Sequence, residues 1–141
     1  AIGAADAINS GMPVFIATRV MELLNDRGKA ARGSKIHVLG VTYKRDASDC
    51  RESPAIEVIR SLVHIGAKVT FSDPFVRSLA IDGQRLTAVA PTPDRLRECV
   101  LVVIATDHSA FDYFEIVRTA PLVFDLRNAT HGLKSKNLVR L

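Results

Sequence analysis

Hydrophobic side chains recur at every third or fourth position between residues 1 and 26, with polar residues such as Asp6, Arg19 and Glu22 between them. This spacing predicts an amphipathic helix. Pro13 is expected to kink or interrupt the helix, because proline lacks the amide hydrogen and crowds the preceding turn. The pattern starts at Ala1 without a capping residue, so we expect Ala1 to be an artificial boundary.

From Lys35 onward, short apolar runs alternate with amphipathic stretches. Residues 36–41 form a nearly continuous apolar run, which is typical of a parallel strand buried on both faces. Ser53 and Pro54 predict the start of a helix over 54–65, and Gly66 predicts its end. The pattern also predicts strands at 68–72, 100–105 and 122–125, a short strand near 86–89, and helices at 94–98 and 110–118.

This alternation indicates the α/β class. We expect a Rossmann-like parallel sheet with right-handed crossovers and helices on both faces, preceded by the N-terminal helix. Gly28 and the basic residues 29–35 link that helix to the sheet. The tail from Gly132 onward is expected to be poorly ordered.

Composition agrees with one compact domain. In a chain of 141 residues, 48% hydrophobic and 24% charged residues are enough for a real core under a polar surface. The sequence contains neither a membrane-spanning run nor a secretory signal, so we expect a cytoplasmic protein without a membrane partner. Cys50 and Cys99 are too few and too far apart for a disulfide framework or a thiolate cluster, and we predict neither zinc nor a structural disulfide.

The net charge of +4 arises from 19 Lys and Arg residues against 15 acids, which are interspersed along the chain. Nucleic acid is therefore not the expected partner. A mild positive excess equally suits a phosphate-bearing small molecule, if the cations converge on one site.

Ligands of such sheets bind beyond the C-terminal ends of the strands. Three loops are therefore candidates for ligand binding: 42–53, 106–109 and 126–131. The stretch from Gly40 to Pro54, which includes the first loop, contains one glycine where the dinucleotide fingerprint needs three, so we do not expect it to hold NAD in the ordinary Rossmann manner. It carries Lys44, Arg45 and Arg51 instead. Arginine and lysine side chains together suit a diphosphate.

The residues of this loop resemble a known family. Tyr43-Lys44, Asp49 and Arg51-Glu52-Ser53-Pro54-Ala55, followed by Asp73-Pro74, resemble the C-terminal, UDP-sugar-binding domain of the UDP-glucose/GDP-mannose dehydrogenase family. The resemblance extends to Thr106-Asp107 and to residues 124–128, and so covers nearly all of residues 1–131. Residues 9–13 and 53–55 look closest to the bacterial UDP-N-acetylhexosamine 6-dehydrogenases, while UDP-glucose and GDP-mannose remain open as substrates.

The resemblance implies a division of the chain and a set of binding residues. Residues 1–33 would be the end of a central-domain linker and dimerisation helix, and residues 34–141 the nucleotide-sugar-binding domain. Tyr43, Lys44 and Arg127 would contact the UDP-sugar, and Arg51 would touch the NAD pyrophosphate across an interdomain cleft.

The resemblance also implies an activity that this chain does not perform alone. Enzymes of the family oxidise the sugar C6 alcohol to the carboxylate in two NAD-linked steps, through a thiohemiacetal and a thioester on a cysteine, and serve polysaccharide biosynthesis. That cysteine belongs to a central-domain motif without a counterpart here, and NAD is held mainly by a missing N-terminal domain. We therefore expect no catalytic residue in this chain, an inactive isolated fragment, and a homodimer in the whole enzyme.

Several residues keep two interpretations. Asp46 and Asp49 accept sugar or ribose hydroxyls, or they pair with Lys44 and Arg51 to hold the loop, which we favour. Asp73 grips a ribose or caps a turn, with neither favoured. His108 lines the crevice, or it is solvated or helix-capping, which we favour.

The remaining candidates are expected to be structural. Cys50 adjoins Arg51 but lies outside the matched motif, and Cys99 is expected in the core. Phe111, Tyr113 and Phe114 are expected to pack their helix against the sheet. Two other functions stay open: a free-standing nucleotide-binding module, and a dimerisation element built on helix 1–26.

Overall fold

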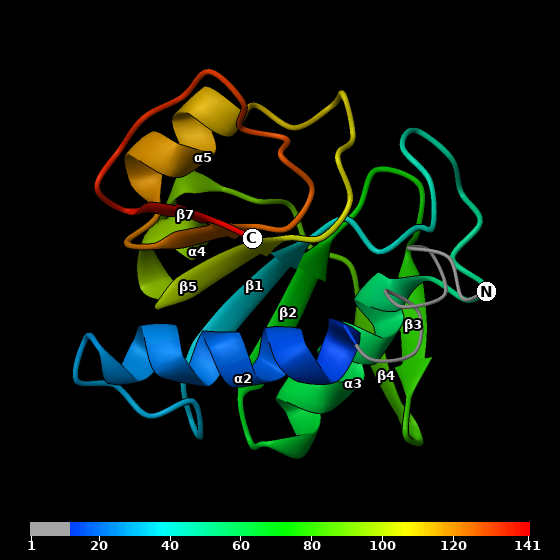
Figure 1. Ribbon diagram of the computed structural model, residues 1–141. Coiled ribbons are helices and arrows are strands. Elements are labelled where there is room, and N and C mark those ends of the chain that lie inside the picture. The colour runs from blue at the N-terminus through cyan, green and yellow to red at the C-terminus, as the bar shows by residue number, and fades with distance from the viewer. Residues whose placement is uncertain (1–11) are drawn as a thin grey trace, which may run out of the picture.

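The computed structural model describes residues 12–141, and the expectations for residues 1–11 lie outside this range. Helices and strands alternate along most of the chain, as Figure 1 shows. The helices are α2 (Met12–Asn25), α3 (Pro54–His64), α4 (Pro93–Glu98) and α5 (Tyr113–Thr119). The strands are β1 (Lys35–Leu39), β2 (Lys68–Ser72), β3 (Ser78–Ile81), β4 (Gln84–Thr87), β5 (Leu101–Ile104), β6 (Val123–Asp125) and β7 (Leu138–Arg140).

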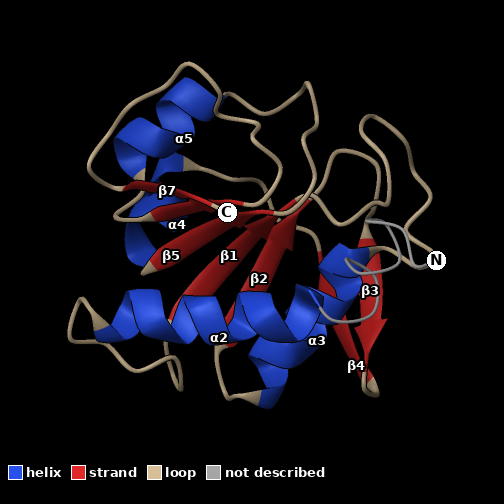
Figure 2. Ribbon diagram, viewed as in Figure 1, coloured by secondary structure: helices blue, strands red, loops and turns tan. Residues whose placement is uncertain are grey.

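Five of the strands form one parallel sheet in the order β2-β1-β5-β6-β7. Helices α2 and α3 cover one face of this sheet, and α4 and α5 cover the other (Figure 2). The predicted α/β class, with a Rossmann-like parallel sheet between two helical layers, is confirmed. The strand order reverses between β1 and β5, because the chain leaves β1 toward β2 on one side and later returns to β5 on the other.

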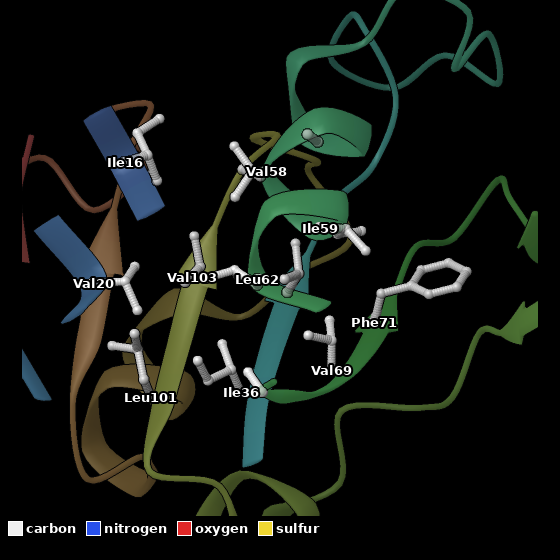
Figure 3. Close-up of a cluster of buried hydrophobic side chains, with 14 of the residues drawn as sticks. Ile16, Val20, Ile36, Val58, Ile59, Leu62, Val69, Phe71, Leu101 and Val103 are labelled. Carbon is white, nitrogen blue, oxygen red and sulfur yellow. The ribbon is translucent and has the colours of Figure 1, made fainter. Parts of the chain in front are cut away.

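Alternate residues of each central strand feed the two cores. In β1, Ile36 and Val38 join the core under α2 and α3, whereas Leu39 joins the core under α4 and α5. Figure 3 shows the first core, where Ile16 and Val20 of α2 meet residues of α3 and the sheet. Each fully buried aliphatic side chain contributes roughly 1.5–3 kcal/mol. Within the described residues, α2 is therefore part of the packed unit.

Local signals set the ends of α3 as the sequence predicts. The Ser53 hydroxyl accepts a hydrogen bond from the Ala55 amide, Pro54 begins the helix, and Gly66 follows it at φ +94°. Pro13 lies in the first turn of α2, where its missing amide hydrogen breaks no helical bond.

The prediction of a poorly ordered tail after Gly132 is wrong. Residues 138–140 form β7, which pairs in parallel with β6 at the sheet edge. The Asn137 side-chain amide donates to the carbonyls of Val117 and Ala120 at 2.8 and 2.9 Å, and so ties the tail to the end of α5. Arg140 donates to the carbonyls of Thr130 and Leu133. These side-chain hydrogen bonds hold β7 in place. The strand has only three residues, which is too short for an apolar run to predict it.

The stretch between 75 and 93 contains a hairpin, of which the sequence predicts only one strand. The strand expected near 86–89 corresponds to β4, but its antiparallel partner β3 was missed. Asp82 and Gly83 join the two strands with φ of +48° and +82°, as Asp-Gly turns of two-residue hairpins do. The Asp-Gly pair was therefore the available signal.

Candidate functional site

The loops expected to bind ligand leave the same edge of the sheet. Residues 40–53 follow β1, residues 105–112 follow β5 and residues 126–131 follow β6, and β5 lies between β1 and β6. This edge includes the point where strand order reverses, which is the usual ligand position in open α/β sheets.

The loops after β1 and β5 touch at Gly40. A Cβ atom at this position, where φ is +83°, would lie 2.6 Å from both the Cβ and the carbonyl oxygen of Thr106. The Thr106 hydroxyl donates to the Thr42 carbonyl at 2.7 Å. Gly40 is thus required for close contact between two strand ends, and the loop has no glycine cradle for a dinucleotide.

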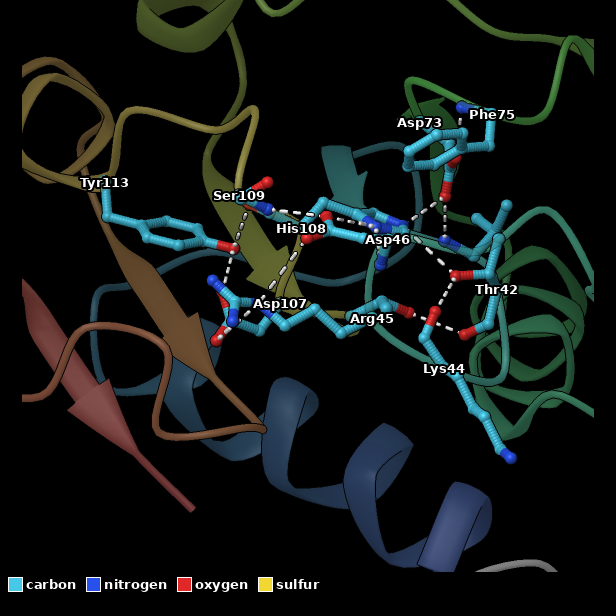
Figure 4. A network of polar contacts seen from close by, with 12 residues as sticks. Thr42, Lys44, Arg45, Asp46, Asp73, Phe75, Asp107, His108, Ser109 and Tyr113 are labelled. Atoms are coloured by element: carbon cyan, nitrogen blue, oxygen red, sulfur yellow. Dashed lines mark hydrogen bonds and ion pairs between the residues drawn. The ribbon is translucent and has the colours of Figure 1, made fainter.

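His108 lies at the centre of a polar network that joins three strand ends (Figure 4). Its side chain is 0% exposed, and its Nε2 atom lies 2.9 Å from Asp73 Oδ2 and 3.1 Å from Thr42 Oγ1. The amide of Asp46 donates to its Nδ1 atom at 2.9 Å. The favoured expectation that His108 is solvated or helix-capping is wrong, because the three loops close over the imidazole.

Asp73 follows β2 and uses both carboxylate oxygens within the protein. Oδ2 accepts from the Val41 amide and Oδ1 from the Phe75 amide, each at 2.8 Å. Its side chain is fully buried. Asp73 therefore caps the turn after β2, in agreement with the second of its two interpretations.

The segment from Tyr43 to Asp49 forms a closed loop. The Tyr43 amide donates to the Asp49 carbonyl at 2.9 Å, and the Thr42 hydroxyl donates to the Lys44 carbonyl at 2.7 Å. The Lys44 side chain is exposed and points away from the network in Figure 4.

The two acids of this loop have separate partners. Asp49 binds Arg51 through two parallel contacts of 3.1 Å, and these hydrogen bonds lower the pKa of Asp49. Asp46 accepts from the Ser109 amide at 2.8 Å, and chiefly this bond lowers the pKa of Asp46. The expected pairing is confirmed for Asp49 with Arg51, whereas the cation beside Asp46 is Arg45, at 4.0 Å, and not Lys44.

Arg45 and Tyr113 meet at Asp107. The Arg45 guanidinium lies 3.8 Å from Asp107 Oδ2, and the Tyr113 hydroxyl donates to Oδ1 at 2.9 Å. Burial and the bond to Asp107 raise the pKa of Tyr113 well above its usual range. Tyr113 and Phe111 pack against the second core as expected, but Phe114 is 63% exposed, so its predicted packing is wrong.

Asp125 shapes the loop that carries Arg127. Its buried carboxylate accepts from the amides of Arg127, Ala129 and Thr130 at 2.8 to 3.1 Å, and from the Thr130 hydroxyl at 2.5 Å. The Arg127 guanidinium turns back toward β5 and donates to the Ala105 carbonyl at 3.4 Å. Asp125 is not among the predicted site residues, although an acid at the end of a buried strand was the available signal.

The four predicted binding residues therefore divide between two loops. Tyr43, Lys44 and Arg51 lie in the loop after β1, and Arg127 lies in the loop after β6. Arg51 is directed to solvent, with 87% of its side chain exposed. The two loops flank the end of β5, so the backbone positions of all four residues lie at one edge of the sheet.

Comparison with known proteins decides the family. Residues 37–132 match the UDP-glucose/GDP-mannose dehydrogenase family, UDP binding domain. The chain belongs to this family. The match starts inside β1 and ends just after the Asp125 loop, so it contains all four predicted binding residues.

Individual relatives agree with this assignment. The chain is 35% identical over 128 residues to a UDP-glucose 6-dehydrogenase of Rhizobium meliloti, covering 80% of this chain and 29% of the relative. It is 32% identical over 144 residues to a UDP-N-acetyl-D-mannosamine dehydrogenase of Methanococcus maripaludis, covering 96% and 32%. The solved UDP-D-ManNAc dehydrogenase of Pyrococcus horikoshii superposes with a TM-score of 0.77 at 25% identity, covering 96% and 32%. The chain thus spans about a third of the length of these dehydrogenases.

The family's UDP binding domain contains two free thiols here. Cys99 is buried, and burial raises its pKa to about 11, which keeps the thiol protonated and unreactive. Cys50 lines an open hollow of about 470 Å³ together with Glu52 and Ser53, and neither Lys44 nor Arg127 lines that hollow. Among residues 12–141, no group of three acid, histidine or cysteine side chains is arranged to hold a metal ion, and no helix is long and apolar enough to cross a bilayer.

Proposed function

We propose that this chain is the nucleotide-sugar-binding part of an NAD-dependent UDP-sugar 6-dehydrogenase, which oxidises the C6 alcohol of a UDP-sugar to the uronic acid. The observation that carries the proposal is the position of Lys44 and Arg127 on either side of the end of β5. The family assignment and the coverage of about a third of each relative support it.

Each binding residue has a role that fits its position. Lys44, an exposed point charge, and Arg127, a planar fork held over β5, neutralise the two phosphates. Tyr43 lies in the same closed loop and contacts the nucleotide sugar.

NAD does not fit the loop after β1 as its main site. Members of the family use NAD, but here Gly40 is filled against Thr106 and Asp73 is occupied by protein donors, so neither the glycine cradle nor the ribose-binding acid is available. Arg51 is exposed and supplies one cation to a pyrophosphate held chiefly by another domain. In this proposal another domain forms most of the cofactor cleft, and this chain contributes Arg51 to it.

The rest of the proposal concerns the whole enzyme. Residues 34–141 form the binding domain, and residues 1–33 belong to a linker and dimerisation helix. The outer face of α2 supports the dimerisation role, since Val14, Phe15 and Met21 are 66%, 54% and 40% exposed. The substrate we favour is a UDP-N-acetylhexosamine, with UDP-glucose and GDP-mannose as alternatives, in a cytoplasmic pathway of polysaccharide synthesis.

Calorimetric titration of the chain with UDP-glucose and with UDP-N-acetylmannosamine tests the binding role. Lys44→Ala and Arg127→Ala are each expected to weaken binding by about tenfold or more, because a hydrogen bond to a charged group contributes about 1.5–3 kcal/mol. Arg97→Ala is the matched control, since Arg97 is an exposed arginine near the end of α4, just before the start of β5. Its affinity is expected to equal that of the wild type.

If Lys44→Ala and Arg127→Ala leave the affinity unchanged, the assigned site is wrong. If the wild type binds no UDP-sugar but sediments as a dimer, the chain is the dimerisation module that the apolar face of α2 would also allow.

A further inference from the structure

His108 has contacts that packing alone does not require. Its ring centroid lies 5.3 Å from that of Phe75 and 5.7 Å from that of Phe111, so an aromatic hydrocarbon could fill the same space. Both ring nitrogens nevertheless have polar partners on other loops. The question is what those two nitrogens hold in place.

The partners determine which nitrogen carries the proton. A backbone amide can only donate, so the Asp46 amide at 2.9 Å requires a lone pair on Nδ1. Nε2 therefore carries the hydrogen and donates toward Asp73 Oδ2 at 2.9 Å, with Thr42 Oγ1 at 3.1 Å as a second acceptor. The hydrogen of Thr42 itself is directed to the Lys44 carbonyl. His108 is thus a neutral, Nε2-protonated imidazole.

These bonds hold the backbone on both sides of Lys44. Before it, Thr42 lies against Nε2 and donates to the Lys44 carbonyl. After it, Asp46 is bound to Nδ1 through its amide and to the Ser109 amide through its carboxylate. Asp46 has φ +53°, a conformation that residues other than glycine rarely adopt without support from their surroundings.

We propose that His108 is the positioning residue for Lys44. Its Nδ1 lone pair fixes the Lys44–Asp46 backbone against the end of β5, so that the ammonium group is already placed for the diphosphate when the UDP-sugar arrives. Binding then does not have to order this loop, which would otherwise reduce the affinity. The inference rests on the proposed function and adds a residue that touches no ligand.

Two substitutions separate the two nitrogens. In His108→Asn the amide oxygen can occupy the place of Nδ1 and accept from Asp46, whereas in His108→Gln the amide nitrogen can reach the place of Nε2 and donate to Asp73. Each variant loses the contacts of one ring nitrogen in the same network, and both are therefore expected to lower the melting temperature. UDP-glucose is the probe, because its diphosphate has no proton that titrates near neutral pH.

The expected result is an affinity within about threefold of the wild type for His108→Asn and about tenfold weaker for His108→Gln, as one lost hydrogen bond predicts. In the double variant of His108→Gln with Lys44→Ala, the effect of His108→Gln should vanish, since no ammonium group remains to be positioned. Equal affinities for the Asn and Gln variants, or an undiminished effect in the double variant, would overturn the proposal.

A ligand-free measurement separates this inference from the proposed function. Nitrogen chemical shifts of the His108 ring should show a protonated Nε2, and amide exchange at Asp46 should accelerate in His108→Gln but not in His108→Asn. A protonated Nδ1 contradicts the inference even if UDP-glucose binds. If the nitrogen shifts of His108 and the amide exchange at Asp46 are as expected but the protein binds no UDP-glucose, the proposed function is wrong. His108 then has no binding group to position.

Discussion

At the scale of single residues, His37 is a second buried imidazole with a different role. It lies in the middle of β1 with its side chain 0% exposed, between Thr70 Oγ1 at 2.6 Å and Ser72 Oγ at 2.7 Å on the neighbouring strand. The Ser72 hydroxyl donates to the Val89 carbonyl, so Nε2 of His37 must donate to Ser72. A neutral imidazole satisfies every group of this network.

Burial, with a smaller contribution from the charge of Arg95, lowers the pKa of His37 from 6.5 to about 4. In the unfolded chain His37 is therefore protonated below about pH 6.5, whereas in the folded protein it is protonated only below about pH 4. The stability that His37 contributes is complete above pH 6.5 and is lost as the pH falls toward 4, by at most about 3 kcal/mol.

Urea unfolding at several pH values between 7.5 and 4.5 measures this loss. His37→Gln, which keeps a donor and an acceptor but does not titrate, is expected to flatten the pH dependence relative to the wild type. His64→Gln, at an exposed histidine of α3, is the control for the loss of one imidazole. Parallel curves for the wild type and His37→Gln would show that His37 does not cause the loss.

Residues of the site differ in how well the sequence predicts them. Lys44, Arg45 and Arg51 can be picked out as candidates from the sequence because three cations gather in the one loop that follows a buried strand. His108 is not legible, since its partners Asp73 and Asp46 are 35 and 62 positions away and only the sheet brings them together. Asp125 and His37 stand out in the sequence as polar residues in apolar strands, but the sequence does not predict which residues they bind.

At the scale of elements, Gly40 decides how closely β1 and β5 end together. Gly40→Ala combines a strained φ of +83° with a Cβ 2.6 Å from Thr106, and is expected to destabilise the fold by about 3 kcal/mol or more. Gly83→Ala is the matched control. Gly83 has φ +82° with no atom within 4 Å of an added Cβ, so only the backbone strain of about 1–2 kcal/mol applies.

Thermal and urea unfolding measure the loss of stability in both variants. The additional loss in Gly40→Ala is the part caused by the contact with Thr106. Equal destabilisation by the two substitutions would mean that the strand ends can separate without cost. In that case Gly40 would be needed only for its backbone conformation.

Elements with strong periodicity are predicted well, and elements held by side-chain bonds are not. The ends of α3 follow from Ser53, Pro54 and Gly66, because caps act locally. β7 has three residues and depends on Asn137 and Arg140 reaching distant carbonyls, which no local pattern encodes. Within residues 12–141 the sequence therefore predicts four strands of the parallel sheet and misses the edge strand β7.

At the scale of the whole molecule, the proposed binding cations and the two cysteine thiols lie at different sites. Lys44 and Arg127 flank the end of β5, Cys50 opens into the separate hollow beside Glu52, and Cys99 is buried as a protonated thiol. Sugar oxidation through a thioester needs a reactive thiolate and a bound nicotinamide next to the same sugar carbon. In the proposed function, both groups come from other parts of the enzyme.

We therefore expect the purified chain to bind UDP-glucose or UDP-N-acetylmannosamine and yet to form no NADH when NAD is added. A full-length UDP-sugar dehydrogenase in the same assay shows that the conditions allow the reaction. Cys50→Ser is expected to retain the wild-type affinity, because the Cys50 hollow is not lined by the binding cations. NADH formation that disappears in Cys50→Ser would place the nucleophile in this chain, and the separation of binding from catalysis would be wrong.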